Sequence, residues 1–312
     1  MVAQNALRSK DADIKVGYAC NNDCLFCTAS WKKDLGDRDT QTILEEVERI
    51  LSQDRVERIV YSGGEATFRE DLAEVLHHAK ALGIAQQEIQ TNGRRLHNMR
   101  YFETLHEAGL TSCFISIHGA DAPTHDGLTR RPGSFQETSA GLTNVDRLGI
   151  MFTTNTVVCR QNYRSLGSLI RFLGSSFSSI RKAKLSYPEL QGGAADNLSQ
   201  VVAPLWEVAP YIREAIEIGV EEGVYVVTES VPACLLGIRY RRADELISPP
   251  VISMSDLAFI DSSWRPPDDG IFYEACKECD LRKFCCGVHL LHHEEFGEHA
   301  CFTPISLAAA GW

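Results

Sequence analysis

The chain has 312 residues, 44% of them hydrophobic, which is enough for one large domain or one domain with a smaller appendage. Its formal net charge is −11 and it has no long run of lysine and arginine, which argues against nucleic acid as a partner. No stretch approaches the ~20 apolar residues of a membrane span, and the N-terminus lacks the apolar core of a signal peptide. We therefore expect a cytoplasmic protein with no membrane partner.

After an N-terminal extension over residues 1–12, short apolar segments alternate with amphipathic ones. The predicted strands are 13–20, 58–64, 88–93, 113–119, 152–158 and 184–188, and the predicted helices are 42–51, 70–83, 98–109, 135–148, 163–174 and 205–223. Residues 224–230 are a candidate for one more strand. This alternation predicts an α/β fold, a partial (β/α)6 barrel of the TIM type with parallel strands inside and helices outside. In such a fold, functional residues lie at the carboxyl ends of the strands.

Eleven cysteines are present, and eight of them fall in or near two groups. Cysteines are normally kept reduced in the cytosol, so clustered ones more often bind metal than form disulfides. The first group has the spacing CxxxCxxC, at Cys20, Cys24 and Cys27. A structural zinc site and an iron–sulfur cube each need four ligands, and no obvious fourth follows. In a cube, three thiolates leave one iron without a protein ligand, and such vacancies mark catalytic rather than structural sites.

This cysteine motif, with Phe26 before its last cysteine, is followed by a strand that ends in SGGEAT, residues 62–67. The combination resembles the radical S-adenosylmethionine (radical SAM) superfamily over residues 13–231. The resemblance implies a [4Fe–4S] cluster whose open iron is chelated by the amino and carboxylate groups of SAM. One electron from the reduced cluster then cleaves SAM to a 5′-deoxyadenosyl radical, which abstracts a hydrogen atom from the substrate.

The resemblance also implies residues that contact SAM. Gly63, Gly64 and Glu65 match the motif that contacts the SAM amino group, with Ala66 where the family usually has proline. Further candidates are Ser116 near the SAM carboxylate, Arg130 or Arg131 as the cation for that carboxylate, and Asn155 at the ribose. Ordinary loop or strand packing is the alternative for these four. For His118, His125 and Asp126 we favour hydrogen bonding within a loop over a general-base role.

From about residue 232 the chain becomes proline-rich and irregular, and we expect residues 232–312 to form a small appended domain held together by metal. The segment ACKECDLRKFCCGV resembles the auxiliary-cluster region of the SPASM and twitch subfamilies of radical SAM enzymes. This resemblance implies a second [4Fe–4S] cluster on Cys234, Cys276, Cys279 and Cys285. Cys286 and Cys301 are alternative ligands, and a zinc ribbon is the alternative site.

The resemblance leaves the substrate open. The residues before Cys20 are too few for the leader-binding domain of many peptide maturases, so we expect a small polar metabolite of natural-product biosynthesis: a sugar, aminocyclitol or nucleoside. Tyr187 and Glu189 are the candidate substrate contacts. The auxiliary cluster is expected to be an electron acceptor, a substrate ligand or a sulfur donor. An electron donor such as flavodoxin or ferredoxin is the expected protein partner. The alternatives are a radical SAM maturase that crosslinks a precursor peptide, and a non-catalytic metal-binding protein.

Overall fold

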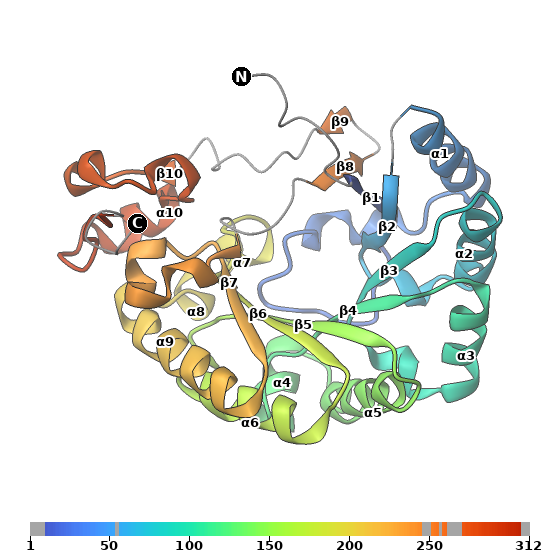
Figure 1. Cartoon of the computed structure of the whole chain (residues 1–312), viewed down its shortest axis with the longest axis horizontal. Coiled ribbons are helices and arrows are strands. Elements are labelled where there is room, and N and C mark those ends of the chain that lie inside the picture. Colours follow the sequence, from blue (N-terminus) through green and yellow to red (C-terminus); the bar gives the residue numbers. More distant parts are fainter. Residues whose placement is uncertain (1–9, 54–55, 245–250, 256–257, 261–269, 307–312) are drawn as a thin grey trace.

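The computed structural model describes residues 10–53, 56–244, 251–255, 258–260 and 270–306. Its main feature is a strongly curved sheet with helices along its outer side (Figure 1). Seven parallel strands follow one another in chain order across this sheet. They are β1 (Lys10–Gly17), β2 (Val56–Gly63), β3 (Gln86–Thr91), β4 (Ser112–Ser116), β5 (Met151–Val157), β6 (Ile180–Ser186) and β7 (Tyr225–Glu229).

The larger helices connect successive strands and cover the outer face of the sheet (Figure 1). They are α1 (Thr40–Gln53), α2 (Leu72–Ala81), α3 (Met99–Ala108), α5 (Ser134–Arg147), α6 (Leu166–Ser176) and α9 (Leu205–Glu222). The predicted strand–helix alternation is confirmed, and residues 225–229 do form a seventh parallel strand. Because all seven strands run the same way, their carboxyl ends lie at one rim of the sheet.

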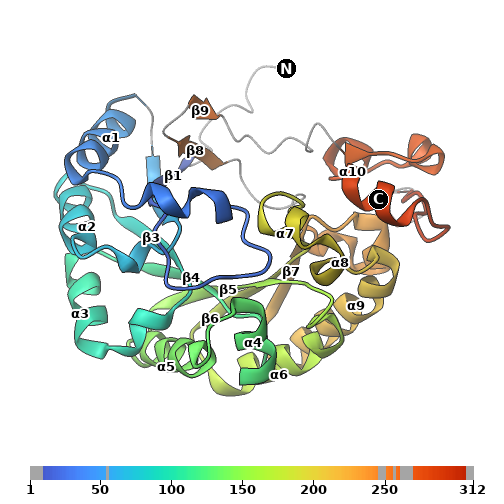
Figure 2. The same cartoon turned by 180° about the vertical axis from the view of Figure 1, so that it is seen from behind.

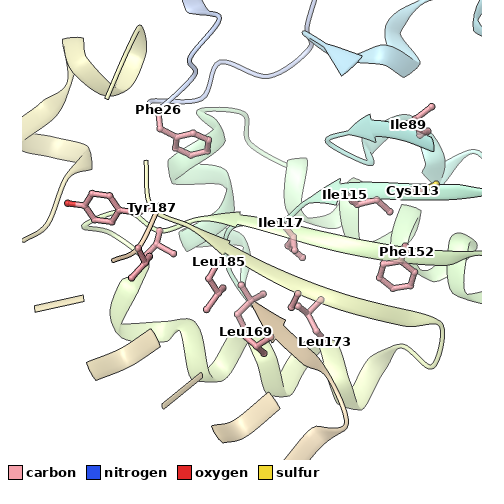
Figure 3. Packing of buried hydrophobic residues seen from close by; sticks show 14 of the residues in the cluster. Phe26, Ile89, Cys113, Ile115, Ile117, Phe152, Leu169, Leu173, Leu185 and Tyr187 are labelled. Atoms are coloured by element: carbon pink, nitrogen blue, oxygen red, sulfur yellow. The ribbon is translucent and has the colours of Figure 1, made fainter. Parts of the chain in front are cut away.

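Local sequence explains these outer helices. In α1, Ile43, Val47 and Ile50 lie on one face and are buried, while the Asp39 carboxylate accepts a hydrogen bond from the Thr42 amide at the helix start. Figure 3 shows the same kind of packing at α6, where Leu169 and Leu173 lie beneath Leu185 of β6 and beneath Ile117, which directly follows β4. The apolar core therefore fills the space between the sheet and its helices.

Three short helices lie near the carboxyl rim of the sheet (Figure 2). They are α4 (Ala122–Thr129), α7 (Gly193–Asp196) and α8 (Leu198–Val201). The sequence did not predict α4, which begins at Asp121, whose side chain accepts a hydrogen bond from the Thr124 amide at 2.8 Å. The first cysteine motif packs against these helices.

The C-terminal part is not wholly separate from the sheet. Strand β8 (Val251–Ser255) pairs in parallel with β1, and β9 (Ala258–Ile260) pairs antiparallel with β8. The cysteine-rich remainder consists of η5 (Ala233–Arg242), η7 (Glu274–Glu278), η8 (Arg282–Phe284), the hairpin of β10 (Gly270–Ile271) with β11 (Val288–His289), and α10 (Leu290–Phe296). Among the described helices, none is long and apolar enough to cross a membrane.

Candidate active site

The first cysteine motif lies in a loop over residues 18–29, here called the cysteine loop, which follows β1 at the carboxyl rim. Its backbone is bound to the end of α4, because the amides of Asp23 and Leu25 donate to the carbonyls of Thr129 (3.0 Å) and Leu128 (3.1 Å). On its other side, the Gly193 amide of α7 donates to the carbonyl of Cys27 at 2.8 Å. Figure 2 shows this loop in dark blue, crossing the open end of the sheet.

The three thiols of the cysteine loop lie close enough to affect one another's ionisation. Burial raises the pKa of Cys24 far above its ordinary value, and the charges of Cys20 and Cys27 raise it further. Burial also raises the pKa of Cys20 to about 11, although the hydrogen bond that its sulfur accepts from the Asn22 amide at 3.4 Å acts to lower this pKa. In the described residues, no three histidine, cysteine, aspartate or glutamate side chains are arranged to hold a single metal ion. The loop therefore brings the three cysteines close together at the rim.

The two glycines of SGGEAT are needed for a close approach within the chain. A Cβ on Gly63 would lie 2.0 Å from the carbonyl oxygen of Gly17, and one on Gly64 would lie 2.4 Å from those of Tyr18 and Ala19. The Gly64 amide donates to the Gly17 carbonyl and the Glu65 amide to the Ala19 carbonyl, both at 2.9 Å. The end of β2 therefore holds the start of the cysteine loop in place. Contact of Gly63 and Gly64 with SAM stays a prediction.

The Glu65 carboxylate is buried and links β2 to β3. It accepts hydrogen bonds from the amide and hydroxyl of Thr67 (3.0 and 2.6 Å), from the Thr91 hydroxyl (2.6 Å) and from the Asn92 amide (2.6 Å). Burial raises its pKa in spite of these four donors. The side chain thus already has partners within the chain. The predicted contact of Glu65 with the SAM amino group stays a prediction.

A further anchor, which the sequence analysis missed, comes from the end of β3. Arg94, at the start of η3 (Arg94–His97), donates from Nη1 to the Asn21 carbonyl at 2.6 Å and to Asn22 Oδ1 at 3.0 Å. Its Nε donates to Glu137 of α5 at 2.5 Å. Asn92 adds a bond to Asn21 Oδ1 at 2.6 Å. The one signal in the sequence was position, because TNGRR follows a strand at the rim where functional residues gather.

The concave face of the sheet carries polar side chains. In β5, residues 153, 155 and 157 are half-buried, whereas Phe152, Thr154 and Thr156 are fully buried toward the helices. Strands β4 and β6 alternate in a similar way. Parallel strands packed on both faces are nearly continuously apolar, so this alternation indicates a face that core residues do not fill. The alternation is visible in SCFIS, FTTNTVV and IRKAKLS, which we predicted only as apolar strands.

Two predicted SAM contacts, Ser116 and Asn155, lie side by side on this concave face at the rim. Asn155 Oδ1 accepts a hydrogen bond from the Ser186 hydroxyl at 2.8 Å, and Ser186 also lies 2.9 Å from Glu229 Oε2. The structure therefore joins Asn155 to a polar network that reaches β7. Their contact with SAM stays a prediction.

Lys184 forms the charged centre of that network, and the sequence analysis missed it. Its Nζ lies 2.9 Å from Glu229 Oε1 and 2.7 Å from Asp244 Oδ2. Burial lowers the pKa of Lys184, but the two carboxylates outweigh burial and raise it above its ordinary value. The ammonium is therefore a fixed positive charge on the concave face.

The remaining predicted SAM contacts lie on the outer side of the cysteine loop. Arg130 and Arg131 follow α4 and are exposed, and Arg130 has a left-handed backbone with φ of 55°. Arg130 Nε lies 3.6 Å from Asp23 Oδ2. The pKa of Asp23 is lowered mainly by the hydrogen bond that it accepts from Lys33, and the charges of both arginines lower it further. The structure thus pairs Arg130 with the cysteine loop, while binding of the SAM carboxylate by either arginine remains untested.

His118 and His125 are buried beside the cysteine loop and stack with ring centroids 5.6 Å apart. Burial lowers the pKa of both, that of His125 to about 4. The His118 amide donates to His125 Nδ1 at 3.1 Å, and Phe26 packs edge-on against His118. Asp126 binds the amides of Gly133 and Phe135 at the start of α5. These contacts agree with hydrogen bonding within a loop, the role that we expected.

The two candidate substrate contacts have different surroundings. Tyr187 is buried, and its hydroxyl donates to the Ala203 carbonyl at 2.6 Å. The side chain thus already has partners within the chain, with His292 edge-on against its ring, and its contact with substrate stays a prediction (Figure 3). Glu189 is exposed and accepts a hydrogen bond only from Gln191 among the bonds described, so its contact with substrate stays a prediction.

The second group of cysteines lines a hollow with about 450 Å³ of space, part of it open to solvent. All four predicted auxiliary ligands are among its lining residues: Cys234, Cys276, Cys279 and Cys285. Burial raises the pKa of Cys234 to about 12, and the charges of the other three and of Cys301 contribute. Residues more than forty positions apart in the sequence thus line one hollow.

Backbone donors surround the sulfurs of this hollow. The Ile305 amide donates to Cys279 Sγ at 3.4 Å and the Gly287 amide to Cys285 Sγ at 3.5 Å. The pKa of Cys285 is lowered to about 6, first by the hydrogen bond from the Cys286 thiol and then by the backbone amides of Gly287 and Ala233, although burial acts to raise it. Cys286 therefore lies beside Cys285 as a hydrogen-bond donor. Cys301 is near Cys234 but is not among the lining residues of the hollow.

The cysteine-rich region docks on the start of α9. His292 of α10 is fully buried, and its Nε2 accepts a hydrogen bond from the Leu205 amide at 3.1 Å. Beside it, the rings of Trp206 and His299 stack 4.5 Å apart. The ring of Tyr187 meets His292 edge-on, so this contact connects the second group of cysteines to the end of β6.

Sequence comparison gives one family. The family model described as the Radical SAM superfamily matches residues 14–173. An AdoMet-dependent heme synthase of Oleidesulfovibrio alaskensis is 26% identical over 170 residues, which is 52% of this chain and 42% of that protein. A probable GTP 3′,8-cyclase of Sulfolobus acidocaldarius is 27% identical over 168 residues, 54% of this chain and 53% of that protein. The chain thus spans about half the length of these curated relatives, or less.

Structural comparison agrees on the fold. The crystal structure of Streptococcus suis SuiB bound to precursor peptide SuiA superposes with a TM-score of 0.64 over 96% of this chain and 75% of that chain, at 16% identity. The structure of anSMEcpe with bound AdoMet and Cp18Cys peptide gives a TM-score of 0.62 over 90% of this chain and 89% of that chain, at 14% identity. At these identities the likeness establishes the fold alone.

Proposed function

Because the chain belongs to the radical SAM superfamily, we propose that it is an enzyme that cleaves SAM and abstracts a hydrogen atom from a small polar metabolite. The observation that carries the proposal is the cysteine loop, which brings three thiols together at the rim. A [4Fe–4S] cluster on Cys20, Cys24 and Cys27, once reduced, would supply the electron that cleaves SAM.

This chain's own residues position the cysteine loop. Gly63 and Gly64 allow the end of β2 to contact residues 17–19 directly, and Arg94 binds the loop at Asn21 and Asn22. The backbone around Glu65 and the polar groups of Ser116 and Asn155 face the same rim, so we assign SAM to this place. Arg130 and Arg131 are the cations that we assign to the SAM carboxylate, and both act on Asp23 of the loop together with Lys33.

The substrate is assigned to the concave face, beyond Ser116 and Asn155. The concave face carries the polar groups of Ser186, Glu229 and Lys184, which suit a ligand that is rich in hydroxyl or amino groups. A sugar, aminocyclitol or nucleoside has this chemistry. Glu229 lies five residues before Cys234, so the same strand end leads from this face to the second group of cysteines.

We assign the auxiliary [4Fe–4S] cluster to Cys234, Cys276, Cys279 and Cys285. The support is the hollow that these four line and the amides that donate to Cys279 and Cys285. Such a cluster would accept one electron from the substrate radical, which is thereby converted to an oxidised product, or it would bind the substrate or donate sulfur. A zinc ion is the alternative occupant, because a CxxC pair with two further ligands is also a common zinc arrangement.

A peptide maturase is the second candidate. It is favoured by the overlap with SuiB, whose structure contains a precursor peptide and which superposes on 96% of this chain. The polar concave face would then receive one side chain of the peptide rather than a whole metabolite. Incubation with candidate precursor peptides, followed by mass spectrometry, separates the two.

The decisive experiment is metal analysis after anaerobic purification and reconstitution, for wild type and for a variant with Cys20, Cys24 and Cys27 all changed to Ala. We expect about 8 irons in wild type and about 4 in the variant, with 5′-deoxyadenosine formed only by wild type. A wild-type protein with about 4 irons and bound zinc would make the second site structural. SAM cleavage by the triple variant would contradict the proposed function.

A further inference from the structure

Lys33 reaches back over the cysteine loop from the short helix that follows it. This residue lies in η1 (Ser30–Leu35), and its Nζ donates to the Asn22 carbonyl at 3.1 Å and to Asp23 Oδ1 at 2.9 Å. The side chain is 26% exposed, so a long and flexible chain is held in one geometry here. Its two bonds hold the ammonium against the part of the loop between the first two cysteines.

Asn22 connects this ammonium to the first thiol. Its amide donates to Cys20 Sγ at 3.4 Å, while its carbonyl accepts from Lys33. Burial is the main cause that raises the pKa of both Cys20 and Cys24, and the charge of Lys33 acts to lower it at both thiols. At Cys24 this charge contributes more than the opposing charge of Asp23. The positive field of the ammonium therefore reaches the sulfurs of the loop.

The other charges near the loop do not change the direction of this effect, because the potentials of separate charges add. Asp23 also faces Arg130, whose Nε lies 3.6 Å from Oδ2. Asp39 accepts a bond from the start of α1, and Asp37 forms a backbone bridge with the end of β1. All of these groups remain when Lys33 is replaced. Loss of the ammonium therefore makes the surroundings of the thiols more negative by one charge.

We propose that Lys33 is a positioning residue whose fixed charge raises the reduction potential of the cluster at the cysteine loop. This proposal rests on the proposed function, because it needs a cluster at that loop. Reduction transfers one electron from an external reductant to the cluster, and no bond forms or breaks. The cluster becomes more negative by one charge, so a nearby ammonium stabilises the reduced form more than the oxidised form. Net charge and hydrogen bonding around the sulfurs are the properties that set such potentials.

The test is a potentiometric titration of the reconstituted protein with dithionite and mediator dyes, followed by electron paramagnetic resonance. A parallel sample receives SAM, and the signal that SAM alters is assigned to the cysteine loop, which separates it from an auxiliary cluster. Lys33→Met removes the charge and keeps an apolar stem. At a fixed potential we expect its ratio of reduced to oxidised cluster to be about tenfold lower than in wild type. This ratio corresponds to a shift of about 59 mV to lower potential for one electron.

Lys32→Met is the matched control, because it removes the same charge one position away. Lys32 Nζ lies over the rings of Trp31 at 4.8 Å and Tyr18 at 5.0 Å, so its removal should leave the potential near that of wild type. Lys33→Arg should restore the wild-type potential, since a guanidinium keeps the charge and has donors for both partners. A residue that only shaped the loop would change iron content without moving the potential.

A second pair of variants covers the case in which Lys33→Met binds too little iron for titration. Lys33→Gln keeps an amide donor without the charge, and we expect the same shift to lower potential. Asp23→Asn removes the opposing carboxylate, so its potential should rise. If the clusters of Lys33→Met or Lys33→Gln have the potential of wild type, the proposal is overturned and the proposed function stands. A wild type in which no signal responds to SAM would contradict both.

Discussion

Two adjacent arginines, Arg94 and Arg95, contact different parts of the rim. Arg94 binds the cysteine loop at Asn21 and Asn22, whereas Arg95 donates to the carbonyls of Thr67 and Phe68. We expect Arg94→Ala to lower occupancy of the first cluster by about tenfold or more, since residues that orient metal ligands typically have effects of this size. Iron content and the electron paramagnetic resonance signal with SAM provide the measurement.

Arg95→Ala is the matched control, because it removes the same side chain one position away. Its cluster occupancy should stay near that of wild type. Arg94→Lys should restore part of the occupancy, since one donor can still reach the Asn21 carbonyl. Equal occupancy in Arg94→Ala and Arg95→Ala would show that Arg94 does not position the loop.

The sequence could not single out Arg94 among the rim residues. Cys20, Cys24 and Cys27 are close in the chain, so their spacing alone indicates a shared ligand. Arg94 lies 70 residues away from Cys24, and its contacts depend on how β3 lies relative to the loop after β1. The burial of Tyr187 was missed for the same reason, because its partner Ala203 lies beyond two short helices that the sequence did not predict.

At the scale of elements, the turn after β2 and the cysteine loop are in direct backbone contact. A Cβ on Gly64 would lie 2.4 Å from two carbonyl oxygens of residues 18 and 19. We expect Gly64→Ala to displace the loop, to lower the free energy of unfolding by about 1–3 kcal/mol through overpacking, and to lower iron binding. Thermal unfolding and iron content measure the two effects.

Gly127 of α4 is a suitable control for this substitution. A Cβ there meets nothing within 4 Å and its backbone is helical, so Gly127→Ala should leave stability unchanged or raise it slightly. If Gly64→Ala has the same stability and iron content as wild type, the turn after β2 and the cysteine loop do not need this close approach.

The elements were largely predictable because their signals are local. Apolar periodicity located the seven strands and the outer helices to within a few residues. Helix α4 was missed because its sequence, APTHDGLT, contains proline and glycine and few apolar residues. Its stability comes from the Asp121 cap and from burial of His125 and Leu128 against the rest of the molecule.

At the scale of the whole molecule, His292 connects the second group of cysteines to α9 and to the end of β6. Burial lowers its pKa to about 4, and the charges of His289 and His293 add to this. The unfolded chain, with a histidine pKa near 6.5, therefore binds more protons than the folded one between about pH 6.5 and 4. Stability from this group is present at pH 7 and is lost as the pH falls through that range.

We expect the melting temperature to fall between pH 7 and pH 5 by less in His292→Gln than in wild type. The glutamine amide oxygen can still accept a hydrogen bond from the Leu205 amide, but it does not titrate. The free energy of unfolding that wild type loses between pH 7 and pH 5 should therefore exceed that lost by the variant by up to about 2 kcal/mol. His77→Gln, at an exposed helix position, should behave as wild type. An equal pH dependence in wild type and His292→Gln would exclude His292 as the cause. Calorimetric melting curves provide the measurement.

The sequence by itself determined what depends on residues close together in the chain: the CxxxCxxC and SGGEAT motifs, and the order of strands and helices. From these, membership of the radical SAM superfamily and the α/β fold could be predicted. Tertiary structure alone decided which distant groups meet: Arg94 with the cysteine loop, Lys184 with Asp244, and the four auxiliary cysteines around one hollow. The physical reason is that these contacts depend on the curvature of the sheet and on the docking of α10 against α9, which many weak, non-local contacts determine together.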